Sequence, residues 1–217
     1  MLTPRRLTAY IASISVILAV LVQQVVGWGG LSHFDRTALE TARDINANRD
    51  IFSVTVMFGL RGIILTICLP ILGFLSWRRK SWFPIGGFIL VLLFETGIAG
   101  AIKMSVGRIF PYQLRDYFDL MRIDSGQMAF PSGHAANALA LWGYTAWYLT
   151  LNNKKWRTAA YTIVGIGCIV VGISSWLIRT HWPTDLFAGY AVGAIALLTV
   201  TCSMRALNVN LSATSRR

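Results

Sequence analysis

Long apolar stretches separated by short polar segments dominate the chain, and this pattern predicts a bundle of membrane-spanning helices. A helix needs about 20 predominantly apolar residues to cross a hydrocarbon core of about 30 Å. Six stretches meet this requirement, and they cover residues 7–28, 53–76, 83–102, 131–151, 158–178 and 186–204. Because the connections are short, we expect one all-α domain over residues 1–217, an integral membrane bundle of six transmembrane helices.

The polar segment between the first two stretches reads SHFDRTALETARDINANRD and has a helical pattern of its own. Phe34, Ala38, Ala42 and Ile45 follow one another at near-helical spacing, with charged residues between them. This spacing predicts an amphipathic helix that lies on the outer membrane interface. A solvated loop helix fits the same pattern, so the sequence leaves both interpretations open.

The distribution of charge predicts the orientation of the bundle. With the N-terminus in the cytoplasm, the inside segments contain eleven of the 20 Lys and Arg residues and no carboxylate: Arg5, Arg6, Arg78, Arg79, Lys80, Lys154, Lys155, Arg157, Arg205, Arg216 and Arg217. The other nine cations balance the nine Asp and Glu residues, so the net charge of +11 is cytoplasmic and both termini are inside. Cations split among short loops argue against nucleic-acid binding, and anionic lipid headgroups are their expected neighbours.

Three polar clusters then fall at the outer ends of the predicted helices. They cover residues 103–108, at the end of the third stretch, 132–134, at the start of the fourth, and 179–185, between the fifth and the sixth. A single histidine at a helix end is usually structural. Two histidines, a lysine and an aspartate at one membrane face indicate catalytic chemistry instead.

The residue types in these clusters suit phosphoryl transfer. At the start of the fourth helix, the backbone N–H groups of Ser132 and Gly133 and the helix dipole favour an oxyanion. His181 and Asp185 are four residues apart, so on a helix the carboxylate can hold one imidazole nitrogen while the other faces the substrate.

Two cations complete this candidate phosphate site. Lys103 offers a point charge, and Arg108 offers a planar fork that matches a phosphate group.

The order of these motifs resembles that of the type 2 phosphatidic acid phosphatases, which share their core with the vanadium haloperoxidases. The family pattern is Lys-x6-Arg-Pro, then Pro-Ser-Gly-His, then Ser-Arg-x5-His-x3-Asp. The sequence matches it at Lys103, Pro111, Pro131, Ser132, Gly133, His134, Ser174, His181 and Asp185. The motifs lie within residues 103–185, and the six-helix plan of the family covers nearly the whole chain.

The resemblance implies a mechanism that requires neither a metal nor a cofactor. It implies that His181 attacks phosphorus to form a phosphohistidine, that His134 protonates the leaving oxygen, and that Asp185 orients His181. Lys103, Ser132 and Gly133 would bind the phosphate oxygens.

The implied substrate is a lipid that enters laterally from the outer leaflet, typically phosphatidate, phosphatidylglycerophosphate or a polyprenyl pyrophosphate. We therefore expect a lipid phosphatase in a bacterial cytoplasmic membrane, with its active site facing outward. Two alternatives remain open: a phosphotransferase that passes the phosphoryl group to a second lipid or sugar, and a non-enzymatic lipid-binding or transport protein with a relic site. The oligomeric state does not follow from the sequence.

Both arginines of the family pattern are absent from their usual positions. Phe110 stands where the first-motif arginine is expected, and Ser175 stands where the third-motif arginine is expected. Replacements are available nearby, and we expect Arg108 to bind phosphate, with Arg179 as the second choice; Arg115 and Arg122 are further candidates.

Two charges lie within the predicted membrane helices. Arg61 and Glu95 fall in the second and third apolar stretches at matching depth, about 12 Å below the outer end at 1.5 Å per residue. Unpaired charges at this depth are costly, so we expect the two side chains to form a buried ion pair.

Overall fold

The described part of the protein is almost entirely helical. The structure, a computed structural model, describes residues 4–27, 29–113 and 128–214. Its α-helices are α1 Pro4–Val26, α2 Gly30–Ile45, α3 Arg49–Val56, α4 Arg61–Arg78, α5 Phe83–Val106, α6 Gly133–Asn137, α7 Gly143–Leu149, α8 Lys154–Leu177 and α9 Pro183–Thr214. Three short segments join them: the 3-10 turns η1 Met57–Gly59 and η2 Pro111–Gln113, and the π-helical η4 Ala138–Trp142. The predicted all-α class is confirmed.

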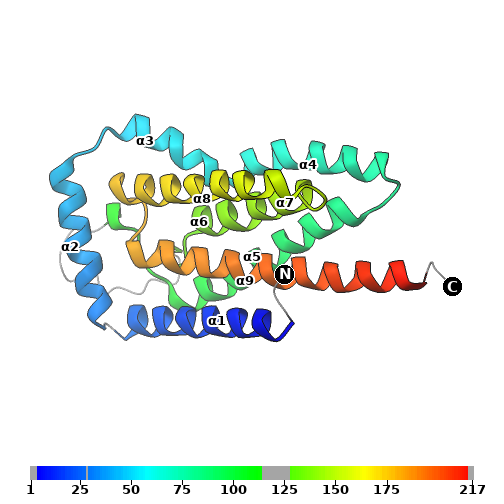
Figure 1. The fold of residues 1–217 in the computed structure, drawn as a ribbon. Helices are drawn as coiled ribbons and strands as arrows, with labels where there is room; N and C mark the ends of the chain where they lie inside the picture. The colour runs from blue at the N-terminus through cyan, green and yellow to red at the C-terminus, as the bar shows by residue number, and fades with distance from the viewer. Residues whose placement is uncertain (1–3, 28, 114–127, 215–217) are drawn as a thin grey trace.

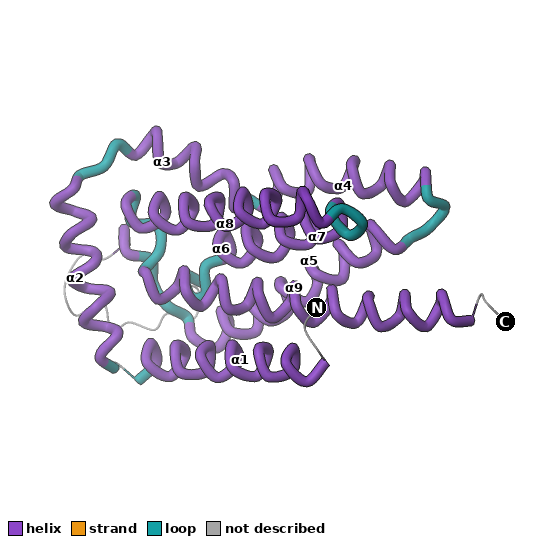
Figure 2. Tube along the Cα trace, viewed as in Figure 1, coloured by secondary structure: helices purple, strands orange, loops and turns teal. Residues whose placement is uncertain are grey.

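The long helices run side by side, and α2 crosses one end of the bundle (Figure 1). The N-terminal end of α1 and the C-terminal end of α9 lie on the side away from α2 (Figure 1). Short loops connect most helices (Figure 2), as the short polar segments of the sequence predicted.

Among the described residues, five helices are long and apolar enough to cross a membrane: α1, α4, α5, α8 and α9. The fourth predicted span, residues 131–151, folds instead as α6, η4 and α7 in direct succession, with 5, 5 and 7 residues. Most of its side chains are buried among the other helices. The number of six crossings therefore stays a prediction.

The second predicted span, residues 53–76, is wrong as a continuous helix, because the chain breaks between α3 and α4. The break packs against the start of α6, where a Cβ on Gly59 would lie 2.5 Å from the carbonyl oxygen of His134. The break leaves backbone carbonyls without helical partners, and the indole Nε1 of Trp142 donates to one of them, that of Phe58, at 2.9 Å. Glycine at position 59 thus lets this turn approach His134 closely.

Close packing of α9 on α6 brings the second and third motifs together. A Cβ on Gly189 would lie 2.4 Å from the carbonyl oxygen of Ser132, and one on Gly193 would lie 2.7 Å from that of Ala136. The two glycines therefore allow backbone contact between the helices. The backbone N–H of Ser132 also donates to the carbonyl oxygen of Asp185 at 2.9 Å, which ties the start of α6 to the start of α9.

The helix expected between the first two apolar stretches is present as α2, but it buries a different face. Its buried side chains are Asp35, Leu39 and Ala42, whereas Phe34 and Ile45 of the predicted apolar face are 48% and 52% exposed. The buried face contacts protein, mainly α1, α8 and α9. Its position at a membrane interface stays a prediction.

The predicted pair of intramembrane charges is present in the structure. Arg61 Nη2 lies 3.1 Å from Glu95 Oε2, and the Glu95 side chain is fully buried. We expected Arg61 to lie within a continuous span. Because the chain breaks before α4, Arg61 is instead the first residue of that helix. Its Nε donates to Asn137 Oδ1 at 3.3 Å, so the pair also contacts α6, one turn after His134.

Candidate active site

The two histidines of the motifs lie close together at the end of the bundle that α2 crosses. His134 is in the first turn of α6, and His181 is in the turn that precedes α9. Their ring centroids are 6.2 Å apart, and His181 is 6% exposed. The structure therefore brings the second and third polar clusters together.

Asp185 holds His181 from the first turn of α9. Its Oδ2 lies 3.4 Å from His181 Nδ1 and accepts the backbone N–H of Trp182 at 3.0 Å. Its Oδ1 accepts from Arg108 Nη1 at 2.6 Å. Both oxygens of this fully buried carboxylate are therefore engaged, and its position is fixed.

The start of α6 faces open space. The hydroxyl of Ser132 caps the helix by accepting the backbone N–H of Ala135 at 3.4 Å. A Cβ on Gly133 would meet no atom within 4 Å. A ligand can therefore approach the backbone N–H of Gly133 closely.

Lys103 lies in the last turn of α5, which ends four residues later than the predicted third span, at Val106. Gly107 follows as the capping residue, and its φ of 60° is left-handed. The ammonium group of Lys103 donates to the carbonyl oxygen of Met128 at 2.6 Å. This contact connects the first motif with the segment that leads into α6.

From the sequence we expected Arg108 to bind phosphate. In the structure its guanidinium instead contacts two carboxylates and a hydroxyl. Its Nη1 donates to Asp185 Oδ1 at 2.6 Å and to Thr184 Oγ1 at 2.7 Å, and its Nη2 donates to Asp35 Oδ2 at 2.7 Å. The guanidinium also lies over the ring of Trp182, 4.9 Å from the centroid. The side chain is 12% exposed, and its terminal nitrogens are occupied by two carboxylates and a hydroxyl.

Two residues of this network, Asp35 and Thr184, were not predicted from the sequence. A signal was present, because Asp35 shares a helical face with Leu39 and Ala42, and an acidic residue on an apolar face needs a partner. Burial raises the pKa of the Asp35 carboxyl above its ordinary value, although Arg108 and the Thr184 hydroxyl act in the opposite direction. Burial lowers the pKa of Arg108, but Asp185 and Asp35 outweigh this effect and leave it above its ordinary value.

The two positions of the absent family arginines both contact His181. The ring of Phe110 is 5.7 Å from the His181 ring, centroid to centroid. Ser175 is fully buried, and its hydroxyl has no hydrogen-bond partner among the described residues. Its carbonyl oxygen accepts the backbone N–H groups of Thr180 and His181, which shapes the turn before α9.

Arg179 lies within the same turn and, with His181, lines a crevice that is too narrow to hold a water molecule. Its φ of 61° is left-handed, and its backbone N–H donates to the carbonyl oxygen of Trp176 at 2.9 Å. Arg115 and Arg122, the other candidates, lie outside the described residues. Within the described ranges, no group of three or more His, Cys, Asp or Glu side chains is arranged to hold a metal ion.

An apolar groove of about 550 Å³ runs beside the site between α2, α8 and α9. It includes Ala38, Gly172, Ile173, Trp176, Pro183 and Phe187 in its lining. Trp176 and Pro183 also line the narrow crevice beside His181, so the groove begins next to the histidine site.

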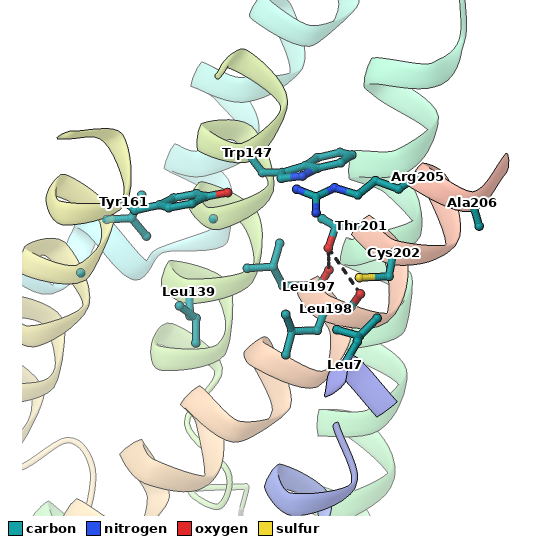
Figure 3. Close-up of a pocket in the computed structure, with 13 residues that line it drawn as sticks. Leu7, Leu139, Trp147, Tyr161, Leu197, Leu198, Thr201, Cys202, Arg205 and Ala206 are labelled. Atoms are coloured by element: carbon teal, nitrogen blue, oxygen red, sulfur yellow. Dashed lines mark hydrogen bonds between the residues drawn. The ribbon is translucent and has the colours of Figure 1, made fainter. Parts of the chain in front are cut away.

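A larger cavity of about 820 Å³ contains none of the predicted site residues (Figure 3). It lies between α7, α8 and α9, and the guanidinium of Arg205 packs over the Trp147 ring there, 5.5 Å from the centroid. Because its lining is mainly apolar and includes no histidine or carboxylate, the histidine site is the better candidate for catalysis.

The fold and the site define an α-helical protein with helices of membrane-spanning length and a two-histidine site at one end of the bundle. The family model described as the PAP2 superfamily matches residues 84–208, and the chain belongs to this superfamily.

Curated relatives and a solved structure are similar to the chain. It is 26% identical over 147 residues to a phosphatidylglycerophosphatase B from Bacillus subtilis (strain 168), a match that covers 65% of this chain and 68% of that protein. It is 29% identical over 126 residues to a lipid A 1-phosphatase from Rhizobium johnstonii, covering 55% of this chain and 47% of the relative. The crystal structure of a transmembrane PAP2-type phosphatidylglycerolphosphate phosphatase from Bacillus subtilis has a TM-score of 0.76 at 20% identity, covering 88% of this chain and 94% of that one. This last likeness shows a shared fold.

Proposed function

We propose that the protein is a membrane lipid phosphatase that hydrolyses a phosphate monoester or pyrophosphate of a lipid. The observation that carries this proposal is the placement of His181, held by Asp185 at 3.4 Å, opposite His134 at a centroid distance of 6.2 Å. Both curated relatives are named as phosphatases of lipid phosphates, which supports the same substrate class.

His181 is the proposed nucleophile. An ionised Asp185 accepts a hydrogen bond from the protonated Nδ1, which leaves the lone pair of Nε2 available for phosphorus. A bond forms between Nε2 and phosphorus while the bond from phosphorus to the lipid oxygen breaks. The product of this step is a phosphohistidine.

His134 is the proposed general acid for the leaving oxygen. It donates a proton to the lipid alkoxide or phosphate as that group departs, and a water molecule then attacks the phosphohistidine to release inorganic phosphate. Lys103, Arg179, the hydroxyl of Ser132 and the backbone N–H of Gly133 are the proposed binding groups for the phosphate oxygens, because the backbone N–H of Ser132 already donates to the carbonyl oxygen of Asp185. The carboxylate contacts of Arg108 support a role in positioning Asp185 in place of phosphate binding.

We propose that the site faces outward and takes its lipid from the outer leaflet. The basic residues where α4 connects to α5 and α7 connects to α8 lie at helix ends away from α2 (Figure 1), and the positive-inside rule puts them in the cytoplasm. This orientation leaves the α2 end outside. The groove between α2, α8 and α9 has the volume, about 550 Å³, and the apolar lining to hold part of a lipid chain beside the histidine site.

The test is phosphate release by purified protein in detergent from phosphatidate, phosphatidylglycerophosphate and a polyprenyl pyrophosphate. We expect release from at least one lipid, and we expect His181→Ala to abolish it, because the covalent step has no substitute nucleophile. His134→Ala should lose most activity on monoesters and less on a substrate with a better leaving group.

His33→Ala is the matched control, because His33 is an exposed histidine on α2, outside the site. It should retain the wild-type rate. Full turnover by folded His181→Ala would remove His181 from the nucleophile role. Transfer of labelled phosphate to a second lipid, without release to water, would indicate a phosphotransferase.

A further inference from the structure

Asp35 connects α2 to the start of α9 although it lies far from the catalytic motifs in sequence. Its side chain is 1% exposed, and its two oxygens contact two partners. Oδ1 accepts the backbone N–H of Thr184 at 3.1 Å, and Oδ2 accepts from the Thr184 hydroxyl and, at 2.7 Å, from Arg108 Nη2.

The contact with Thr184 caps α9 from another helix. Pro183, the first residue of α9, has no N–H to satisfy, and Thr184 follows with an N–H that has no acceptor within the helix. Asp35 supplies that acceptor. It therefore fixes the turn of α9 that carries the next residue, Asp185.

The contact with Arg108 fixes the Asp185 side chain itself. Arg108 lies between the two carboxylates, with Nη2 on Asp35 and Nη1 on Asp185 Oδ1. The other oxygen of Asp185 faces His181 Nδ1. Any movement of Arg108 thus changes the position of the carboxylate that orients His181.

We propose that Asp35 is a positioning residue of the active site, which sets the orientation of His181 through Arg108 and Asp185. The kinetic part of this proposal rests on the proposed phosphatase function. The Asp35 carboxylate binds one terminal nitrogen of Arg108, and Asp185 binds the other. Asp185 therefore shares the positive charge of Arg108 with Asp35, and its second oxygen stays available to the imidazole. Without the Asp35 charge, Arg108 turns toward Asp185 alone and draws that carboxylate away from His181.

The first test compares kcat and KM for Asp35→Asn with those for Asp44→Asn. Asp44 is an exposed carboxylate on the same helix and serves as a matched control. Because His181 acts in the chemical step, we expect Asp35→Asn to lower kcat by about tenfold or more while KM changes by less than about twofold. Asp44→Asn should match the wild type. A purely structural role would lower the amount of folded enzyme and leave kcat per folded molecule unchanged.

The second test does not depend on turnover. The chain has three histidines, so selective ¹⁵N labelling gives few imidazole signals, and those of His181 can be assigned with His181→Ala. We expect Asp35→Asn to shift the His181 signals, because the hydrogen bond at Nδ1 changes, and Asp44→Asn to leave them in place. If no lipid in the panel is hydrolysed, the proposed function fails, but these signals still decide the role of Asp35.

Asp35→Glu covers the case in which Asp35→Asn does not fold. It keeps the negative charge and moves the carboxylate by one methylene, so a folded protein with reduced kcat and shifted His181 signals is the expected result. Wild-type kcat together with unchanged His181 signals in any folded Asp35 variant would overturn the proposal.

Discussion

Two ion-pair clusters flank the two histidines, and they differ in how completely their groups are satisfied. Behind His181, Asp35, Arg108 and Asp185 are at most 12% exposed, and all four carboxylate oxygens have partners. Near His134, Glu95 is fully buried, but its Oε1 has no partner among the described residues, and the Arg61 side chain is 39% exposed.

The difference suggests different tasks. A fully satisfied buried network holds each member in one position, which is what an oriented nucleophile requires. A partly exposed pair with an unused oxygen fixes less geometry and mainly compensates a charge that would otherwise be buried alone. We therefore expect substitutions in the network behind His181 to lower kcat per folded molecule. Substitutions in the pair near His134 should lower the free energy of unfolding and leave kcat nearly unchanged.

Arg108→Ala should have the largest effect. It leaves two buried carboxylates without their cation, so we expect a loss of about 3 to 5 kcal/mol in the free energy of unfolding. In the protein that folds, kcat should fall by about a hundredfold, equivalent to roughly 2.7 kcal/mol of transition-state stabilisation. Thermal unfolding in detergent and phosphate release measure the two effects.

Arg108→Lys sharpens this prediction. It keeps the charge, but a single ammonium cannot replace a planar fork between two carboxylates, so only part of kcat should return. A higher KM with unchanged kcat in Arg108→Ala would instead place Arg108 on the phosphate, as the sequence alone suggested.

Glu95→Gln should have a smaller effect, and on stability more than on turnover. It removes the charge that pairs with Arg61, which keeps its hydrogen bond to Asn137, so we expect a loss of about 1 kcal/mol, or roughly 2 to 4 °C in Tm. Turnover per folded molecule should stay within about twofold of the wild type.

Glu40→Gln is the control for Glu95→Gln, since Glu40 pairs with Arg36 at 3.0 Å on the exposed face of α2. A surface pair of this kind contributes little to the free energy of unfolding, so the Tm of Glu40→Gln should not differ measurably from that of the wild type. A large loss of turnover with unchanged Tm in Glu95→Gln would assign Glu95 to the active site and remove the contrast between the two clusters.

The sequence could predict the features that depend on local spacing. The apolar stretches predicted the long helices, and the four-residue interval between His181 and Asp185 predicted their contact. The matched depths of Arg61 and Glu95 predicted an ion pair across two helices, because a buried charge in a membrane protein has few possible partners.

The features that the sequence could not predict depend on contacts between distant segments. Asp35 is separated by 73 positions from Arg108 and by 149 from Thr184, and no local pattern connects them. Its carboxylate pairs with Arg108, for which spacing alone had predicted a contact with phosphate. The break after Gly59 has the same origin, since the glycine matters only because α6 packs against it.

Phe110→Arg should have the smallest effect and tests whether the site lacks a phosphate-binding arginine. With Arg108 held by two carboxylates, the half-buried position of Phe110 beside His181 is the accessible place to restore a planar cation. Ser175, the other departure from the family pattern, is fully buried and has no comparable room. A pair formed at a half-exposed position is worth less than about 1 kcal/mol, so we expect Phe110→Arg to lower KM by about threefold with little change in kcat. Phe110→Leu separates the loss of the ring from the gain of charge and should leave KM unchanged. If Phe110→Arg lowers kcat and leaves KM as it was, the added guanidinium competes for Asp185, and the network behind His181 is less rigid than its contacts indicate.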